Sequence, residues 1–120
     1  MTDPVATVID VLGAALPSVD VGGELPPEGS AELPRGPAVT VSRSGGSDTP
    51  YLMRPEMELL CWAPSDAQAS ALAYDCLHAL QAAAQDHPSL SSAAAVTDGS
   101  DPWAAGAARY RLLVDLTINT

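Results

Sequence analysis

The side chains that could do chemistry in this sequence are few, and they are not grouped as a catalytic site requires. Catalysis needs a nucleophile with a base, an acid–base pair or a cluster of metal ligands. The two histidines, His78 and His87, are the candidate bases. His78 falls on the outer face of a predicted helix, four residues after Tyr74, where an interface or stacked histidine is the more frequent role. His87 lies just past the same helix, where a cation interacts favourably with the helix dipole.

Two acidic pairs are the remaining candidates. Glu56 and Glu58 share one face of a predicted strand, although a solvated or arginine-paired face is more common than a catalytic carboxylate pair. Asp98 and Asp101 could ligate a cation, but their segment lacks the further ligands of a calcium loop. The sequence SGGS at 44–47 has neither Gly-x-Gly-x-x-Gly nor a following Lys-Ser/Thr, so it is no phosphate loop. We therefore expect no enzymatic activity, no metal and no cofactor.

Charge and composition narrow the class of protein. Fifteen acidic residues face five basic ones, all of them arginine, which gives a net charge of −10. Such a surface repels nucleic-acid phosphates, so specific DNA binding is not expected. No run of about 18 apolar residues and no basic N-terminal segment is present, so we expect neither a membrane span nor a signal peptide. Cys61 and Cys76 are expected to be free buried thiols, and the 120 residues to form one domain, 1–120.

The elements that position these residues begin with a helix over 3–17. Asp3 is the expected N-cap, Pro4 suits the first helical position and Pro17 ends the helix. Helical spacing places one set of apolar residues on its buried face: Val5, Val8, Ile9, Leu12 and Leu16. Residues 17–37 hold most of the Pro and Gly, so they are expected to be an exposed arm or loop with a short strand near 19–25.

Two strands and a second helix follow. Alternation of β-branched residues predicts a strand over 38–43, and the Gly- and Ser-rich 44–50 is then expected to be a flexible loop. The next strand places Met57, Leu59 and Cys61 on one face and Glu56, Glu58, Leu60 and Trp62 on the other. Pro64 stops this strand. Ser65 and Gln68 form a capping box for a helix that runs to about residue 85.

The second helix has two contrasting faces. Its expected core face consists of Ala69, Leu72, Ala73, Cys76, Leu77 and Leu80. A solvated helix face is normally rich in Glu, Lys and Arg, but the opposite face here carries small, aromatic and nearly uncharged residues: Ala67, Ala71, Tyr74, His78, Ala82 and Gln85. We expect this face to be covered by another surface.

The C-terminal third adds two strands. A weak strand is expected over 93–97, followed by a turn-rich loop over 98–107. The last strand, 109–118, alternates clearly, with Tyr110, Leu112, Val114, Leu116 and Ile118 on one face. The order α-β-β-β-α-β-β predicts an α+β fold, with a mainly antiparallel sheet of four to five strands and two helices on one of its faces.

Several local patterns, taken together and in order, resemble a known family. After the first helix come VGGELPP (21–27) and PAVTVSRSGG (37–46). RPEMELLCWAPSDAQASALA (54–73) and DPWAAGAARYRLLVDLTI (101–118) follow. This arrangement is similar to the tail terminator, or tail-completion, proteins of long-tailed bacteriophages, especially those of actinobacterial phages. The likeness covers nearly the whole chain and departs from the family at 44–55, where the family often carries basic residues.

The resemblance implies a structural virion protein and a set of partners. Such subunits close into a ring, expected as a hexamer, on the end of the tail tube. The ring stops tube polymerisation and meets the head and neck connector proteins. DNA would pass through its lumen without specific binding, and no membrane is involved. The resemblance also implies assembly in the host cytoplasm and a final place in the tail or neck of the virion.

Two surfaces are the candidates for these contacts. The first is the outer face of the second helix, through Ala67, Ala71, Tyr74, His78 and Ala82. The second is a partner-contact loop that comprises Gly45, Gly46, Tyr51, Leu52, Met53 and Arg54, expected to be mobile in the free subunit and ordered in the virion. Another neck component, a head-completion or head–tail joining protein, is the alternative, and a small-molecule-binding or enzymatic domain is the remote one.

Overall fold

The computed structural model describes residues 3–23, 38–86, 90–100 and 108–119. Within them the chain forms two helices and five strands in the predicted order α-β-β-β-α-β-β, so the α+β prediction is confirmed. The elements are α1 (Pro4–Ala15), β1 (Asp20–Gly22), β2 (Ala38–Asp48), β3 (Leu52–Ala63), α2 (Asp66–Asp86), β4 (Leu90–Ser100) and β5 (Ala108–Asn119).

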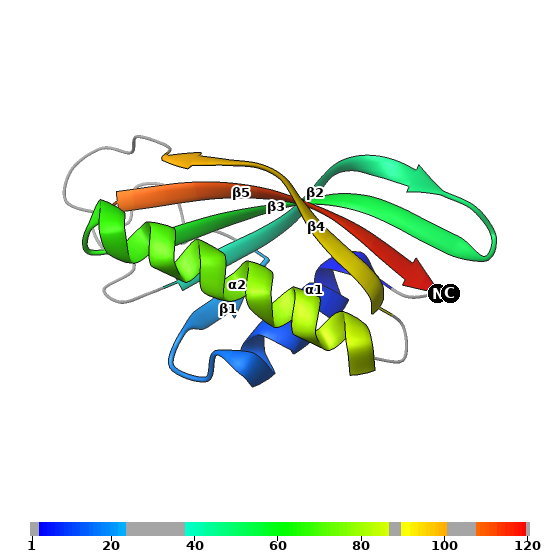
Figure 1. Cartoon of the computed structure of the whole chain (residues 1–120), viewed down its shortest axis with the longest axis horizontal. Coiled ribbons are helices and arrows are strands. Elements are labelled where there is room, and N and C mark those ends of the chain that lie inside the picture. The colour runs from blue at the N-terminus through cyan, green and yellow to red at the C-terminus, as the bar shows by residue number, and fades with distance from the viewer. Residues whose placement is uncertain (1–2, 24–37, 87–89, 101–107, 120) are drawn as a thin grey trace.

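The five strands form one sheet in the order β1-β2-β3-β5-β4. All neighbouring strands are antiparallel except the short β1, which pairs parallel to the start of β2. Both helices lie on the same face of the sheet, with α2 running along β3, β5 and β4 and α1 beside it (Figure 1). The hydrophobic core cluster therefore lies between one helical layer and one sheet.

The capping signals read from the sequence are present in α1. Asp3 Oδ1 accepts a hydrogen bond from the backbone N–H of Val5 at 2.9 Å, and Pro4 occupies the first turn. Of the predicted core face, Val8 and Leu12 are fully buried, while Val5, Ile9 and Leu16 are partly buried against the same cluster. Thr7 and Val11 are also buried, so the buried stripe of α1 is wider than predicted.

Half of the predicted capping box at the start of α2 is present, because the Gln68 side chain accepts from the Ser65 hydroxyl and not from the Ser65 backbone N–H. The N–H of Gln68 donates to Ser65 Oγ at 3.3 Å, and the Ser65 hydroxyl donates to Gln68 Oε1 at 3.1 Å. The hydroxyl therefore acts as both acceptor and donor and holds the first turn directly behind Pro64. This arrangement turns the chain from β3 into the helix within two residues.

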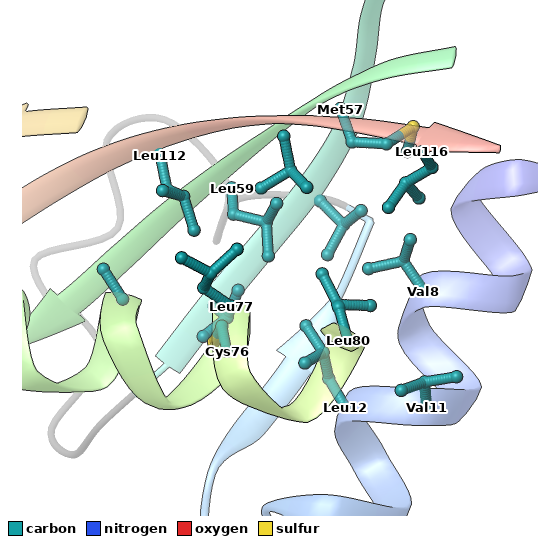
Figure 2. Packing of buried hydrophobic residues seen from close by; sticks show 14 of the residues in the cluster. Val8, Val11, Leu12, Met57, Leu59, Cys76, Leu77, Leu80, Leu112 and Leu116 are labelled. Carbon is teal, nitrogen blue, oxygen red and sulfur yellow. The ribbon is translucent and has the colours of Figure 1, made fainter. Parts of the chain in front are cut away.

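The core joins the two helices to the middle of the sheet. All six residues of the predicted α2 core face are buried, and their neighbours from the sheet are Met57 and Leu59 on β3 and Leu112 and Leu116 on β5 (Figure 2). Val8, Val11 and Leu12 of α1 close the other side of the cluster. Each fully buried side chain of this size contributes roughly 1.5–3 kcal/mol relative to its exposed state, so this cluster fixes α2 on the sheet.

Two strands extend further than the sequence predicts. The prediction that 44–50 is a loop is wrong for Ser44–Asp48, because β2 continues to Asp48 and pairs with β3 through to Met53. Likewise β4 spans Leu90–Ser100 rather than 93–97, so 98–100 belong to a strand. Residues 101–107, the rest of that predicted loop, lie outside the described part of the chain. The same holds for Leu25 and for most of the Pro- and Gly-rich segment 17–37.

The sheet face that lies away from the helices is only partly open to solvent. Trp62 was placed on this face and is 2% exposed, with the guanidinium of Arg109 lying 5.2 Å from its ring centroid. Leu113 on the same face is also buried. Arg111 pairs with Glu58 at 2.8 Å from the neighbouring strand, so the arginine-paired interpretation of this glutamate is confirmed.

Candidate functional site

The predicted partner-contact loop forms the outer part of a long β-hairpin, residues 42–56, which we call the arm. The arm projects past the helical layer at one end of the molecule (Figure 1). Its turn is confined to residues 49–51, where the N–H of Thr49 donates to the carbonyl of Leu52 at 2.7 Å and the N–H of Leu52 donates to Thr49 Oγ1 at 3.0 Å. β2 and β3 pair with each other up to this turn, as far as Asp48 and Met53.

Side-chain hydrogen bonds hold the outer strand of the arm, which is residues 42–48 of β2, in place. The Arg43 guanidinium donates to both carboxylate oxygens of Asp48, at 2.8 and 3.0 Å, and to the carbonyl of Gly45 at 2.9 Å. The register shifts between Arg43 and Gly45, so Ser44 forms a bulge, and its hydroxyl contacts both the carbonyl and the carboxylate of Glu56. The guanidinium of Arg43 lowers the pKa of the Asp48 carboxyl, chiefly through the hydrogen bond.

Gly46 allows the two strands of the arm to approach closely. Its φ is +103°, a conformation that L side chains rarely adopt. A Cβ at this position would also clash with the carbonyl oxygen of Arg54 and lie 2.7 Å from Cα of Pro55. Glycine is therefore required here on both counts. At Gly45, by contrast, an added Cβ would meet nothing within 4 Å.

The residues predicted to contact a partner divide into exposed and buried ones. Tyr51 at the turn is 82% exposed, and Arg54 is exposed on β3. The Arg54 side chain makes no hydrogen bond or ion pair with any described residue. Leu52 is half-buried, and Met53 belongs to the core cluster of its own chain with 7% exposure. Among the predicted partner-contact residues, the side chains of Tyr51 and Arg54 are thus available to a partner, whereas that of Met53 is not.

The outer face of α2 is the second candidate surface, and its five predicted residues lie together on it. Ala67, Ala71, Tyr74, His78 and Ala82 are all exposed. Tyr74 is 43% exposed, and its ring centroid lies 6.4 Å from that of Tyr110 on β5. The outer face of α2 therefore consists of small exposed side chains beside the Tyr74 ring, which packs near Tyr110 of the sheet.

One charged residue on this face was missed in the sequence analysis. Asp75 follows Ala71 by four residues and precedes His78 by three, so it lies on the same helix face. Its side chain is exposed and makes no hydrogen bond or ion pair within the described residues. The helical spacing alone could have identified it, because a residue four positions after Ala71 must share that face.

The tip of the arm and the start of α2 lie far apart within one chain. The molecule measures 44 Å along its longest axis, and these two parts lie at opposite ends of that axis (Figure 1). The tip of the arm therefore cannot reach Ala67 or Ala71 of the same chain. A contact between the tip and these two residues requires two copies.

Of the residues considered for chemistry, Glu56 accepts a hydrogen bond from Ser44 and Glu58 pairs with Arg111. His78 is exposed on α2, and His87 and Asp101 lie outside the described residues. No group of three or more His, Cys, Asp or Glu side chains is positioned to hold a metal ion within the described ranges. Cys61 and Cys76 are free and buried, as predicted. A hydrogen bond with Cys76, together with burial, raises the pKa of the Cys61 thiol.

Within the described residues, neither α1 nor α2 is long and apolar enough to cross a lipid bilayer.

Comparison with known proteins finds chains of similar fold among the solved structures. A chain of the virion of a native gene transfer agent particle superposes with a TM-score of 0.56, covering 96% of this chain and 86% of that chain at 17% sequence identity. At this identity the likeness establishes the shared fold. No protein-family model matches the sequence, and no curated protein matches it either.

Proposed function

We propose that this protein is a structural component of a tailed, phage-like virion, where it forms a ring on the end of the tail tube, stops tube polymerisation and makes the joint to the head or neck. The observation that carries the proposal is the fold shared over 96% of the chain with a protein of the gene transfer agent virion. The order of sequence patterns that resembles tail terminators supports the more specific role. Neither the ring nor the joint requires catalysis.

The positions of the two surfaces support a ring. A ring is built from heterologous contacts, in which two different patches of each subunit meet. The arm and the outer face of α2 are two such patches, and the tip of the arm and the start of α2 lie at opposite ends of the subunit. The net charge of −10 suits a protein around a DNA channel, because like charges keep the DNA from adhering as it passes.

Native mass spectrometry and electron microscopy of the purified protein, alone and with tail tubes, test the ring. We expect closed rings of one size, namely hexamers, either free in solution or on tube ends. Tyr74→Glu and Ala71→Arg place charge on an exposed face, so each should leave the monomer folded while preventing ring formation. Rings from both variants at wild-type yield would remove α2 from the interface.

The alternative from the same structural class is another neck component, a head-completion or head–tail joining protein. The same microscopy separates it from a terminator by location. A terminator should be seen at the end of isolated tail tubes that have never met a head. A neck component should be seen only on heads or on joined particles.

A further inference from the structure

The two exposed surfaces complement each other, and we propose that they are the two halves of one contact between neighbouring copies of this chain. The arm of one copy would dock on the outer face of α2 of the next copy, with Arg54 against Asp75 and Tyr51 over Ala67 and Ala71. The inference rests on the proposed function, which requires a ring, and it names the contact that closes the ring.

The charge argument concerns the arginines. Among the four described, Arg43 pairs with Asp48, Arg111 pairs with Glu58, and Arg109 lies over the ring of Trp62. The Arg54 side chain alone has no partner among the described residues. A cation that has no ion pair among the described residues, on the arm of a strongly acidic protein, suits a carboxylate on a second copy.

Asp75 provides such a carboxylate at a suitable place. It is exposed, has no partner within the described ranges, and shares the outer face of α2 with residues that carry no carboxylate. Arginine binds carboxylates through two parallel N–H donors, so this pair also fixes the orientation of the arm.

The shapes of the two surfaces also fit. Tyr51 is 82% exposed, and tyrosine and arginine are the residue types that most often dominate interface energetics. Ala67 and Ala71 lie one helical turn apart, and their small side chains leave room for an aromatic ring. Because the arm is already held by the Arg43–Asp48 pair, docking would order few additional side chains.

The form of the outer strand favours docking through side chains over addition of a strand. Exposed sheet edges that must not pair with other strands often carry bulges and charges. The outer strand of the arm has a bulge at Ser44, and the Arg43 guanidinium lies along it, bonded to Gly45 and Asp48. The contact surface of the arm is therefore its tip and the side chain of Arg54.

Charge reversal tests the pair directly. Arg54→Glu and Asp75→Arg should each raise the concentration of half-maximal ring assembly by at least about tenfold, because each places like charges together. The double variant, Arg54→Glu with Asp75→Arg, should assemble near the wild-type concentration. Asp10→Arg, an exposed substitution on α1 with the same charge change as Asp75→Arg, is the control and should assemble normally. A double variant no better than the single variants would overturn the proposal.

Crosslinking supplies an independent readout of the same contact. In a Tyr51→Cys, Ala71→Cys double variant, oxidation of assembled protein should give a covalent ladder up to the ring size. A mixture of the two single variants should give dimers only. The native cysteines are buried and do not interfere.

The failures of the two proposals can be told apart. Suppose that intact rings form but do not crosslink, and that Arg54→Glu does not change the concentration at which they assemble. This result would overturn the arm-on-helix contact and leave the ring proposal standing. A protein that forms no ring, either alone or on tube ends, would contradict both.

Discussion

Arg43 donates two hydrogen bonds to the carboxylate of Asp48, five residues further along the same strand, at 2.8 and 3.0 Å. The pair spans the bulge at Ser44 and the two glycines that follow it. This explains how a Gly- and Ser-rich segment, which has the composition of a loop, continues as a strand. The arm is therefore a preformed element of the subunit.

This ion pair predicts a pH dependence of the arm. The pKa of the Asp48 carboxyl is lowered in the folded chain below its ordinary value of 3.8, so the pair contributes stability above that value and loses it as the pH falls through the lowered pKa. Titration followed by NMR should show this low pKa for Asp48, and Arg43→Gln should return it toward the ordinary value. Arg54→Gln, a change in the same arm, should leave it in place. An unchanged Asp48 titration in Arg43→Gln would contradict the account.

The glycines of the arm predict a contrast between two neighbouring substitutions. Gly46→Ala should lower the free energy of unfolding by more than about 1 kcal/mol, because the positive φ and the contact with the Arg54 carbonyl both oppose a Cβ. Gly45→Ala should change it by less than about 0.5 kcal/mol, as an added Cβ meets nothing within 4 Å there. Urea unfolding of both variants measures the difference, and equal effects would show that the backbone at Gly46 is not constrained.

The core predicts loss of folding when a charge is buried in it. Leu77→Asp and Val114→Asp each place an unpaired carboxylate in the cluster between α2 and the sheet, at a cost of several kcal/mol against a typical domain stability of about 5–15 kcal/mol. Circular dichroism should show no cooperative melting for either variant. Asn119→Asp, on the exposed end of β5, is the control and should melt like the wild type. Soluble, cooperatively melting Val114→Asp protein would contradict the assigned faces.

The two thiols predict slow reaction with alkylating reagents. Cys61 and Cys76 are both 0% exposed, and the hydrogen bond between them, together with burial, raises the pKa of Cys61, so little thiolate is available. Iodoacetamide should label neither residue in the native protein at pH 8 and both in 6 M guanidinium, as mass spectrometry would show. Rapid labelling of the native protein would mean that α2 opens from the sheet.

Elements with strong local signals could be predicted from the sequence. Asp3 and Pro4 mark the start of α1, and the Ser65–Gln68 capping box marks α2. The alternation along 109–118 and the six buried residues of α2 follow the periods of a strand and a helix. In each of these cases the information lies within a few residues, so no knowledge of distant contacts is needed.

The arm could not be predicted in the same way, because its strand depends on partners distant in sequence. Ser44 donates a hydrogen bond to Glu56, twelve residues away. The carbonyl of Arg54 on the facing strand leaves no room for a side chain at Gly46. The exposure of Tyr51, and the lack of a partner for Arg54 among the described residues, likewise emerge only once β2 and β3 pair. Asp75 is different, since its place on the outer face of α2 follows from helical spacing.

The most direct test of the proposed function is electron microscopy of tails from particles that lack this protein. The proposal predicts tail tubes of irregular and excessive length that do not join heads, because nothing ends tube polymerisation. Expression of the wild-type chain in trans should restore tubes of uniform length. Tubes of normal length in the absence of the protein would contradict a terminator, and complete, infectious particles would contradict any role in the tail or neck.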